Sequence, residues 1–189
     1  MMTLKGAACA LLMCGVLASS LCTADEPATT SGIWQKQQYS FAYMGFTSTY
    51  SCDGLAHKLK LLLIAAGARA DAKALPGGCA SGYGQVDKFA RADLTFYTLV
   101  PAADAPPSAT GARVSGLWRP VVLTRLAPRE LELGDCELVE QFKSNVLPKF
   151  TTRNLVDQTT CVPNQLSGSS FYLKFESFTL PTPKPKTSP

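Results

Sequence analysis

The chain has little of what metal binding and nucleophilic catalysis need. Its 189 residues contain a single histidine, His57, which excludes a metal site built from several histidines. No two cysteines have the CxxC spacing of a zinc or redox site, and the GxSxG motif of serine hydrolases is missing. We therefore expect no metal and no cofactor, and a binding or structural module more than an enzyme.

The chain also lacks an apolar segment long enough to span a bilayer, which takes about 20 residues. The apolar segment from Ala7 to Ala18 has only 12 residues, follows Lys5 and precedes the small residues of Cys22-Thr23-Ala24. This order is typical of a signal peptide. We predict that residues 1–24 are removed by cleavage after Ala24, and that the soluble protein is periplasmic or secreted.

Lipidation is the alternative fate of the N-terminus. Cys22 could carry a lipid anchor, as the cysteine of a bacterial lipobox does. However, Leu21 precedes it, at a position where a lipobox has a small residue. The signal peptide is therefore the preferred interpretation.

The charge balance gives no sign of a nucleic-acid partner. There are 18 basic and 14 acidic side chains, which leaves a net charge of +4. So mild an excess does not by itself indicate a nucleic acid or a membrane surface. We expect no nucleic-acid partner.

Four cysteines remain once the leader is removed, namely Cys52, Cys79, Cys136 and Cys161. An even number in an oxidising compartment predicts two disulfides, with three possible connectivities. A helix of about 15 residues is roughly 22 Å long, and a return strand of about seven residues covers a similar distance. Each second cysteine should thus return to the start of its helix, so we predict the pairs Cys52–Cys79 and Cys136–Cys161.

The similar spacing within the two pairs predicts a repeated α+β architecture. Each half would be a βαββ-like unit, giving a mostly antiparallel sheet with two helices on one face and one disulfide per half. The predicted divisions are a flexible leader at 25–33, a single domain at 34–181 with halves at about 34–101 and 113–181, a linker at 102–112, and a proline-rich disordered tail at 182–189.

Local signals mark the predicted helices and one unusual strand. Ser51 and Asp135 are good N-cap residues, and Gly67 is a natural stop for the first helix. Leu61, Leu63 and Ile64 widen the apolar stripe of that helix, so it should be buried on more than one side. The strand at 117–124 contains Pro120, which predicts an edge or bulged position.

One stretch of about 60 residues, from 39 to 100, resembles a family of exported proteobacterial proteins without an assigned activity. The similarity lies in Tyr50-Ser51-Cys52-Asp53-Gly54, in the leucine-rich helix that ends in Ala-Gly-Ala-Arg at 66–69, and in the glycine-flanked Cys79. The resemblance implies a periplasmic protein and carries over no functional residue.

Four arginines are the candidate binding residues. Arg113, Arg119 and Arg125 share parity, so an unbroken strand would place them on one face, and Arg129 follows. Such a row could bind an anionic envelope polymer such as lipopolysaccharide, teichoic acid or peptidoglycan. A solvated edge that resists aggregation is the simpler alternative, and a periplasmic protein is the other possible partner.

Asp53 and His57 are the candidate catalytic pair. They lie four positions apart, on the same face of the first helix. A carboxylate can orient an imidazole for acid–base work, which would suit a periplasmic hydrolase or transferase. A surface histidine on a helix is the simpler account, so a non-catalytic binding or envelope-associated protein is our preferred function.

Overall fold

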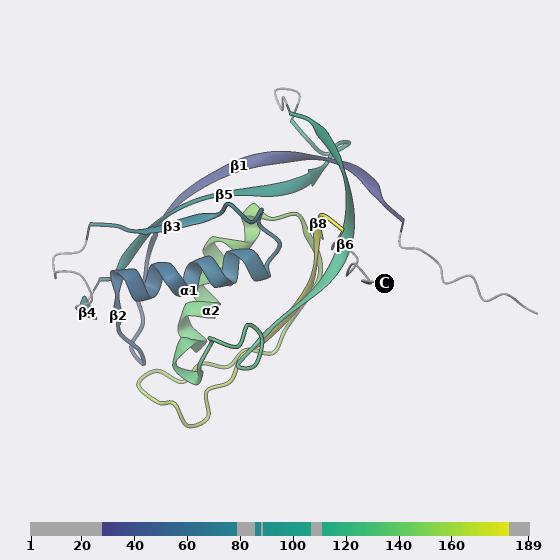
Figure 1. Cartoon of the computed structure of the whole chain (residues 1–189). Coiled ribbons are helices and arrows are strands. Elements are labelled where there is room, and N and C mark those ends of the chain that lie inside the picture. The colour runs from purple at the N-terminus through teal and green to yellow at the C-terminus, as the bar shows by residue number, and fades with distance from the viewer. Residues whose placement is uncertain (1–27, 79–85, 88, 107–110, 182–189) are drawn as a thin grey trace, which may run out of the picture.

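The frame of the protein is a six-stranded antiparallel sheet (Figure 1). The computed structural model describes residues 28–78, 86–87, 89–106 and 111–181. The strand order is β3 (Lys73–Pro76), β5 (Arg91–Pro101), β1 (Thr30–Ala42), β6 (Arg113–Thr124), β8 (Tyr172–Thr179) and β7 (Thr152–Asp157). A small second sheet pairs β2 (Tyr50–Ser51) with β4 (Val86–Asp87).

Two α-helices, α1 (Cys52–Ala65) and α2 (Cys136–Asn145), lie on the concave side of the curved sheet (Figure 1). Short 3-10 helices flank α2, namely η1 (Leu133–Asp135) and η2 (Leu147–Lys149). One apolar core joins the helices to the sheet and includes Leu59, Leu62, Phe96, Phe142 and Phe175. The predicted α+β class, with a mostly antiparallel sheet, is therefore confirmed.

The order of the main elements is strand, helix, strand, strand in both parts of the chain. In the first part these are β1, α1, β3 and β5, and in the second β6, α2, β7 and β8. In each part the closing strand lies between the opening and the return strand. That the parts arose as a repeat stays a prediction.

The two parts of the sheet meet over a short length only. Residues 30–33 of β1 pair with residues 113–116 of β6. Beyond Gly116, β8 is the one strand among the described residues that pairs with β6. The strand predicted at 117–124 therefore begins earlier, at Arg113. The edge position predicted for it fits residues 117–124, which have β8 as their one partner strand among the described residues. The leader predicted at 25–33 is also wrong for residues 30–33, because their backbone belongs to the sheet.

The two helices begin differently. The Ser51 hydroxyl accepts a hydrogen bond of 3.1 Å from the Gly54 amide, which confirms Ser51 as the cap of α1. Asp135 immediately precedes α2, but its carboxylate forms no cap of that helix. It accepts instead from the amide of Glu132, so the predicted side-chain cap is wrong. Its oxygens have partners outside α2, described below.

One of the two predicted disulfides is confirmed. Cys136 and Cys161 are bonded, with Cα atoms 5.6 Å apart. Cys79 lies outside the described residues, so the Cys52–Cys79 bond stays a prediction. The signal peptide, Cys22, the tail at 182–189 and residues 107–110 of the linker also lie outside them.

Two glycines allow the halves of the sheet to cross closely. A Cβ atom on Gly116 would lie 2.5 Å from the Phe178 ring and 2.7 Å from Leu99. A Cβ on Gly32 would lie 2.8 Å from the same ring. Leu99 and Phe178 are 1% and 2% exposed, so neither side chain has free space into which to move. The crossing therefore requires hydrogen in place of a side chain at both positions.

Replacing Gly116 with alanine should destabilise the fold. Overpacking a close contact costs about 1–3 kcal/mol, which exceeds the roughly 0.4–1 kcal/mol that alanine gains by restricting the unfolded chain. Urea unfolding measures the difference. Gly111→Ala is the matched control, since its Cβ would meet only Ile33 at an ordinary 3.5 Å. Equal stability of the two variants would contradict the close crossing.

Candidate functional site

A groove runs along the outer side of α1, between that helix and β6. It consists of two adjoining depressions of about 360 and 400 Å3, which share Ile64, Ala65 and Pro128. The first is completed by Gly67, Arg119, Pro120, Val121, Val122, Ala127 and Thr179, and the second by His57, Lys60 and Leu61.

One wall of the groove is the open edge of β6. Four consecutive residues, 119–122, line it. Neighbouring side chains of a strand point to opposite faces, so a consecutive run lines a groove only where the strand edge forms the wall. Among the described residues this edge has no partner strand, because β1 begins opposite Gly116 and pairs with β6 no further. Pro120 has no N–H to donate, which hinders the addition of another strand.

The floor of the groove is apolar and accessible to solvent. Ile64 on the floor is 41% exposed, and Val122 on the adjoining β6 wall is 36% exposed. The prediction that α1 is buried on more than one side is therefore wrong for Ile64, whose side chain faces this groove. The widened apolar stripe was the sequence signal for the site, although it indicated burial.

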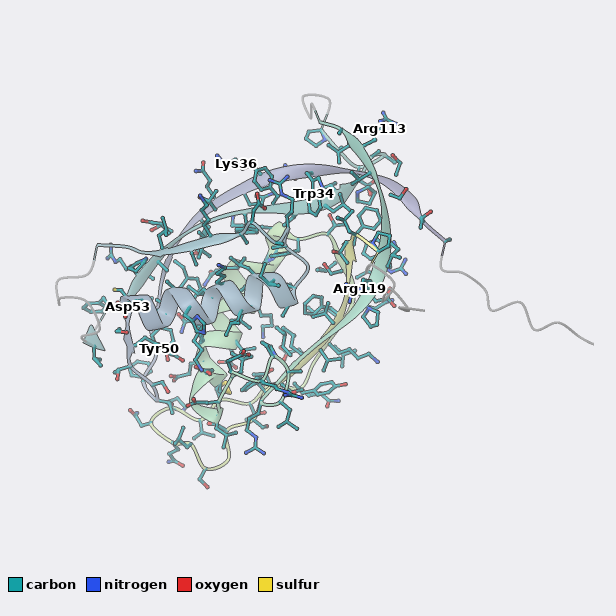
Figure 2. The ribbon with its side chains drawn as sticks, in the orientation of Figure 1. Trp34, Lys36, Tyr50, Asp53, Arg113 and Arg119 are labelled. Carbon is teal, nitrogen blue, oxygen red and sulfur yellow. A yellow bond between two sulfur atoms is a disulfide. The ribbon has the colours of Figure 1, made fainter. Side chains whose placement is uncertain are left out.

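The four candidate arginines do not form one row. Arg119 lines the groove, whereas Arg113 lies near the start of β6, away from it (Figure 2). Arg125 and Arg129 follow the end of β6, in the connection that supplies Pro128. All four are exposed. Within the described ranges, none of the four arginines forms an ion pair with a carboxylate, and neither does Lys60.

Of the candidate catalytic residues, Asp53 lies in the first turn of α1 (Figure 2), and His57 lies one turn further along the helix. His57 is exposed and lines the groove. Asp53 accepts a hydrogen bond of 3.3 Å from the Ser51 hydroxyl. No hydrogen bond or ion pair reaches the His57 ring from any residue that the structure describes. The Asp53/His57 pair therefore stays a prediction.

A buried carboxylate fixes the other wall of the groove against α1. Asp135 is 3% exposed. It accepts from the Tyr50 hydroxyl at 2.5 Å, from Lys58 Nζ at 2.9 Å and from the Glu132 amide at 2.7 Å. Lys58 Nζ also donates to the carbonyl of Glu130. The connection from β6 to α2, which carries Pro128, is thereby attached to the helix.

A second buried carboxylate lies two positions later. Glu137 is 7% exposed and accepts from the Tyr43 hydroxyl and from the amides of Phe46 and Thr47. Burial, and then the Glu137 carboxylate, raise the pKa of Tyr43 above its ordinary value. Burial, and then the bond to Asp135, raise the pKa of Tyr50. Both phenols are thus held in the neutral, donating form.

Sequence analysis missed this network because its partners are distant in the chain. Lys58 and Asp135 are 77 positions apart, and Thr47 and Glu137 are 90 apart. The one local signal was the pair of acids on either side of Cys136. When the backbone on either side of a buried cysteine is buried too, the neighbouring carboxylates need hydrogen-bond donors, even if their position suggests a helix cap.

No metal site emerges from the part of the chain that the structure describes, where no three side chains among His, Cys, Asp and Glu converge. Over the same residues, no helix combines the length and the apolar character required to cross a membrane.

Replacing Lys58 with methionine should loosen the groove wall. The change leaves the buried Asp135 carboxylate without its charged donor, and hydrogen bonds to charged groups are worth about 1.5–3 kcal/mol. We expect a loss of that size in the free energy of unfolding, measured with urea. Lys60→Met, two positions away on the exposed side, should change stability by less than about 0.5 kcal/mol. Similar losses in both variants would contradict this role of Lys58.

The two tyrosines predict a loss of stability at alkaline pH. Because their pKa values are raised in the folded state, their contribution is complete below about pH 10, the ordinary tyrosine value. It is lost as the pH rises further, by up to about 1.4 kcal/mol per pH unit for each group. Tyr50→Phe should make this decline shallower in unfolding experiments. Phenylalanine in place of Tyr172, which is 36% exposed, should leave the decline as it is.

The groove and its supporting network have no counterpart in the comparisons with known proteins. No protein-family model, curated protein or solved structure matches the chain. The resemblance to exported proteobacterial proteins stays a prediction, and the site is interpreted from its own geometry.

Proposed function

We propose that the protein is an exported, non-catalytic binding protein whose groove along α1 takes an anionic amphiphile of the cell envelope. The observation that carries this proposal is an apolar, solvent-accessible groove lined by Arg119 and Lys60, which have no acidic partner among the described residues. An acyl chain suits Ile64 on the floor and Pro128 on the adjoining wall, and a phosphate suits the cations.

Neither half of such a ligand is sufficient alone. An exposed ion pair contributes about 0–1 kcal/mol, so free phosphate would be held weakly. Each buried CH₂ group contributes about 0.8 kcal/mol, so a short acyl chain adds several kcal/mol as an upper limit. An acylated phosphate uses both, whereas a purely polar polymer such as teichoic acid leaves the apolar floor uncovered. Lipopolysaccharide and anionic phospholipids share the required chemistry.

One further observation supports export. The Cys136–Cys161 disulfide is of the kind that persists in oxidising compartments. A leader at residues 1–24 and a repeat of two disulfide-bonded βαββ-like halves belong to the same proposal. The leader would direct the chain to the periplasm, and the disulfides of the two halves would make the exported protein rigid.

The alternative function, a hydrolase or transferase that uses Asp53 and His57, has a single supporting observation. His57 lines the second depression of the groove. An imidazole that takes part in acid–base chemistry is normally oriented by a hydrogen bond to its other nitrogen. Binding is therefore the better supported function.

Binding of short-chain phosphatidic acid to the mature protein tests the proposal by calorimetry. Phosphatidic acid should bind more tightly than phosphatidylcholine with the same chains, and inorganic phosphate should not bind detectably. Arg119→Gln should weaken binding of phosphatidic acid by roughly two- to fivefold, or about 0.4–1 kcal/mol. Raising the salt concentration should weaken it as well.

Arg113→Gln is the matched control, because Arg113 is an exposed arginine of the same strand that does not line the groove. Equal effects of the two substitutions would contradict the proposed site. Ile64→Ser should weaken both lipids, since it removes apolar floor and no charge. Vesicles of phosphatidylglycerol and purified lipopolysaccharide then distinguish the two natural sources of the ligand.

A further inference from the structure

The turn after β1 exposes two large apolar side chains. Met44 is 71% exposed and Phe46 is 74% exposed, and they lie on either side of Gly45. Single exposed apolar residues are common and need no explanation. Here two large apolar side chains lie within three positions, at the rim of a pocket. Such an arrangement is typical of protein interfaces, where Met and Phe are enriched.

This turn is held by side chains of α2. Glu137 Oε2 accepts from the amides of Phe46 and Thr47, at 2.8 Å each. The Gln141 side chain bonds both the amide and the carbonyl of Met44, at 3.0 Å each. Four backbone groups are therefore bonded to two side chains of one helix, as a strand is bonded to its neighbour.

Gly45 allows the turn to wrap around the carboxylate. A Cβ at this position would lie 2.6 Å from Glu137 Oε2 and would overlap the Tyr43 hydroxyl. Because the inner side of the turn is filled in this way, Met44 and Phe46 remain on its outer side. Their exposure is a property of a fixed turn, and ordering it on binding costs little.

A pocket of about 390 Å3 lies beside the turn. Met44 and Phe46 form one side of it, Glu137, Glu140 and Gln141 of α2 form another, and Cys161 and Pro163 a third. The Cys136–Cys161 disulfide fixes the third side to α2. Each side of the pocket is therefore fixed to α2 in the unbound protein.

The charge of the pocket indicates the chemistry of its partner. Its charged lining residues are Glu137 and Glu140, and it has no basic one. Partial burial raises the pKa of Glu140 above its ordinary value, so its carboxylate has lost part of its hydration, which a cation placed against it would replace. A second copy of this chain would bring the Glu140 side chains of both copies together, which is unfavourable.

We propose that the turn Tyr43–Thr47 and the adjoining pocket bind a basic, apolar segment of a partner protein. An aliphatic side chain of that segment fills the space between Met44 and Phe46, and a neighbouring lysine or arginine reaches Glu140. This surface is separate from the groove along α1 and opposite to it in charge, so the proposal does not rest on the proposed function.

A pair of synthetic peptides tests this surface on the full mature protein. One consists of leucine and lysine, and the other has glutamate in place of every lysine. The lysine peptide should bind in calorimetry at low salt, and the glutamate peptide should not. Phe46→Ser should weaken binding at least tenfold, and Glu140→Gln should weaken it several-fold and reduce its salt dependence.

Leu126→Ser is the matched control, because Leu126 is also 74% exposed but lies in the connection after β6. It should bind the lysine peptide like the unchanged protein. Thermal unfolding checks that the variants fold, and hydrogen exchange should show slower exchange at the amides of residues 44–47 when the peptide is bound.

Three results would overturn the proposal. The first is no binding of the lysine peptide at concentrations up to about 1 mM. The second is an equal loss of binding in Phe46→Ser and Leu126→Ser. The third is binding to phosphatidylcholine vesicles that depends on Phe46 while peptide binding does not, which would assign the exposed side chains to a membrane surface.

Discussion

Three consecutive residues, Asp135-Cys136-Glu137, connect segments that are far apart in the chain. The Asp135 carboxylate accepts from Tyr50 on β2 and from Lys58 on α1. Cys136 is bonded to Cys161 in the long connection before β8. Glu137 holds the turn after β1. The wall of the groove and the turn beside the acidic pocket thus depend on one short segment at the start of α2, although they belong to different parts of the surface.

Buried carboxylates suit this role because the loss of a single hydrogen-bond donor costs them a large free energy. Removing one from water costs several kcal/mol, and the cost is recovered only when its full set of donors is in place. Asp135 and Glu137 each have three donors. A displacement that loses one donor leaves part of a buried charge unsolvated, so the neighbouring segments are held in one arrangement. The net gain in stability is small by comparison, and the main consequence is a fixed geometry.

What could be predicted from the sequence was local. The residue type of Ser51 predicted the start of α1. The spacing of Cys136 and Cys161 predicted their disulfide, because a helix and a return strand of similar length bring the two cysteines together. What could not be predicted depends on distant partners. Asp135 has the residue type of an N-cap, yet Lys58 and Tyr50 determine where its oxygens point. Ile64 belongs to an apolar stripe, yet it is exposed beside the part of β6 that β1 does not cover, because β1 begins opposite Gly116.

Net charge is an average that hides how the charges are distributed. The value of +4 combines a groove lined by Arg119 and Lys60 with a pocket lined by Glu137 and Glu140. Ligands of opposite charge can therefore occupy the two surfaces without competing. In both places a charge that salt screens lies beside an apolar contact that salt does not screen. Raising the ionic strength should thus weaken each interaction towards a limit set by its apolar contact, whereas a purely electrostatic surface would lose its ligand altogether.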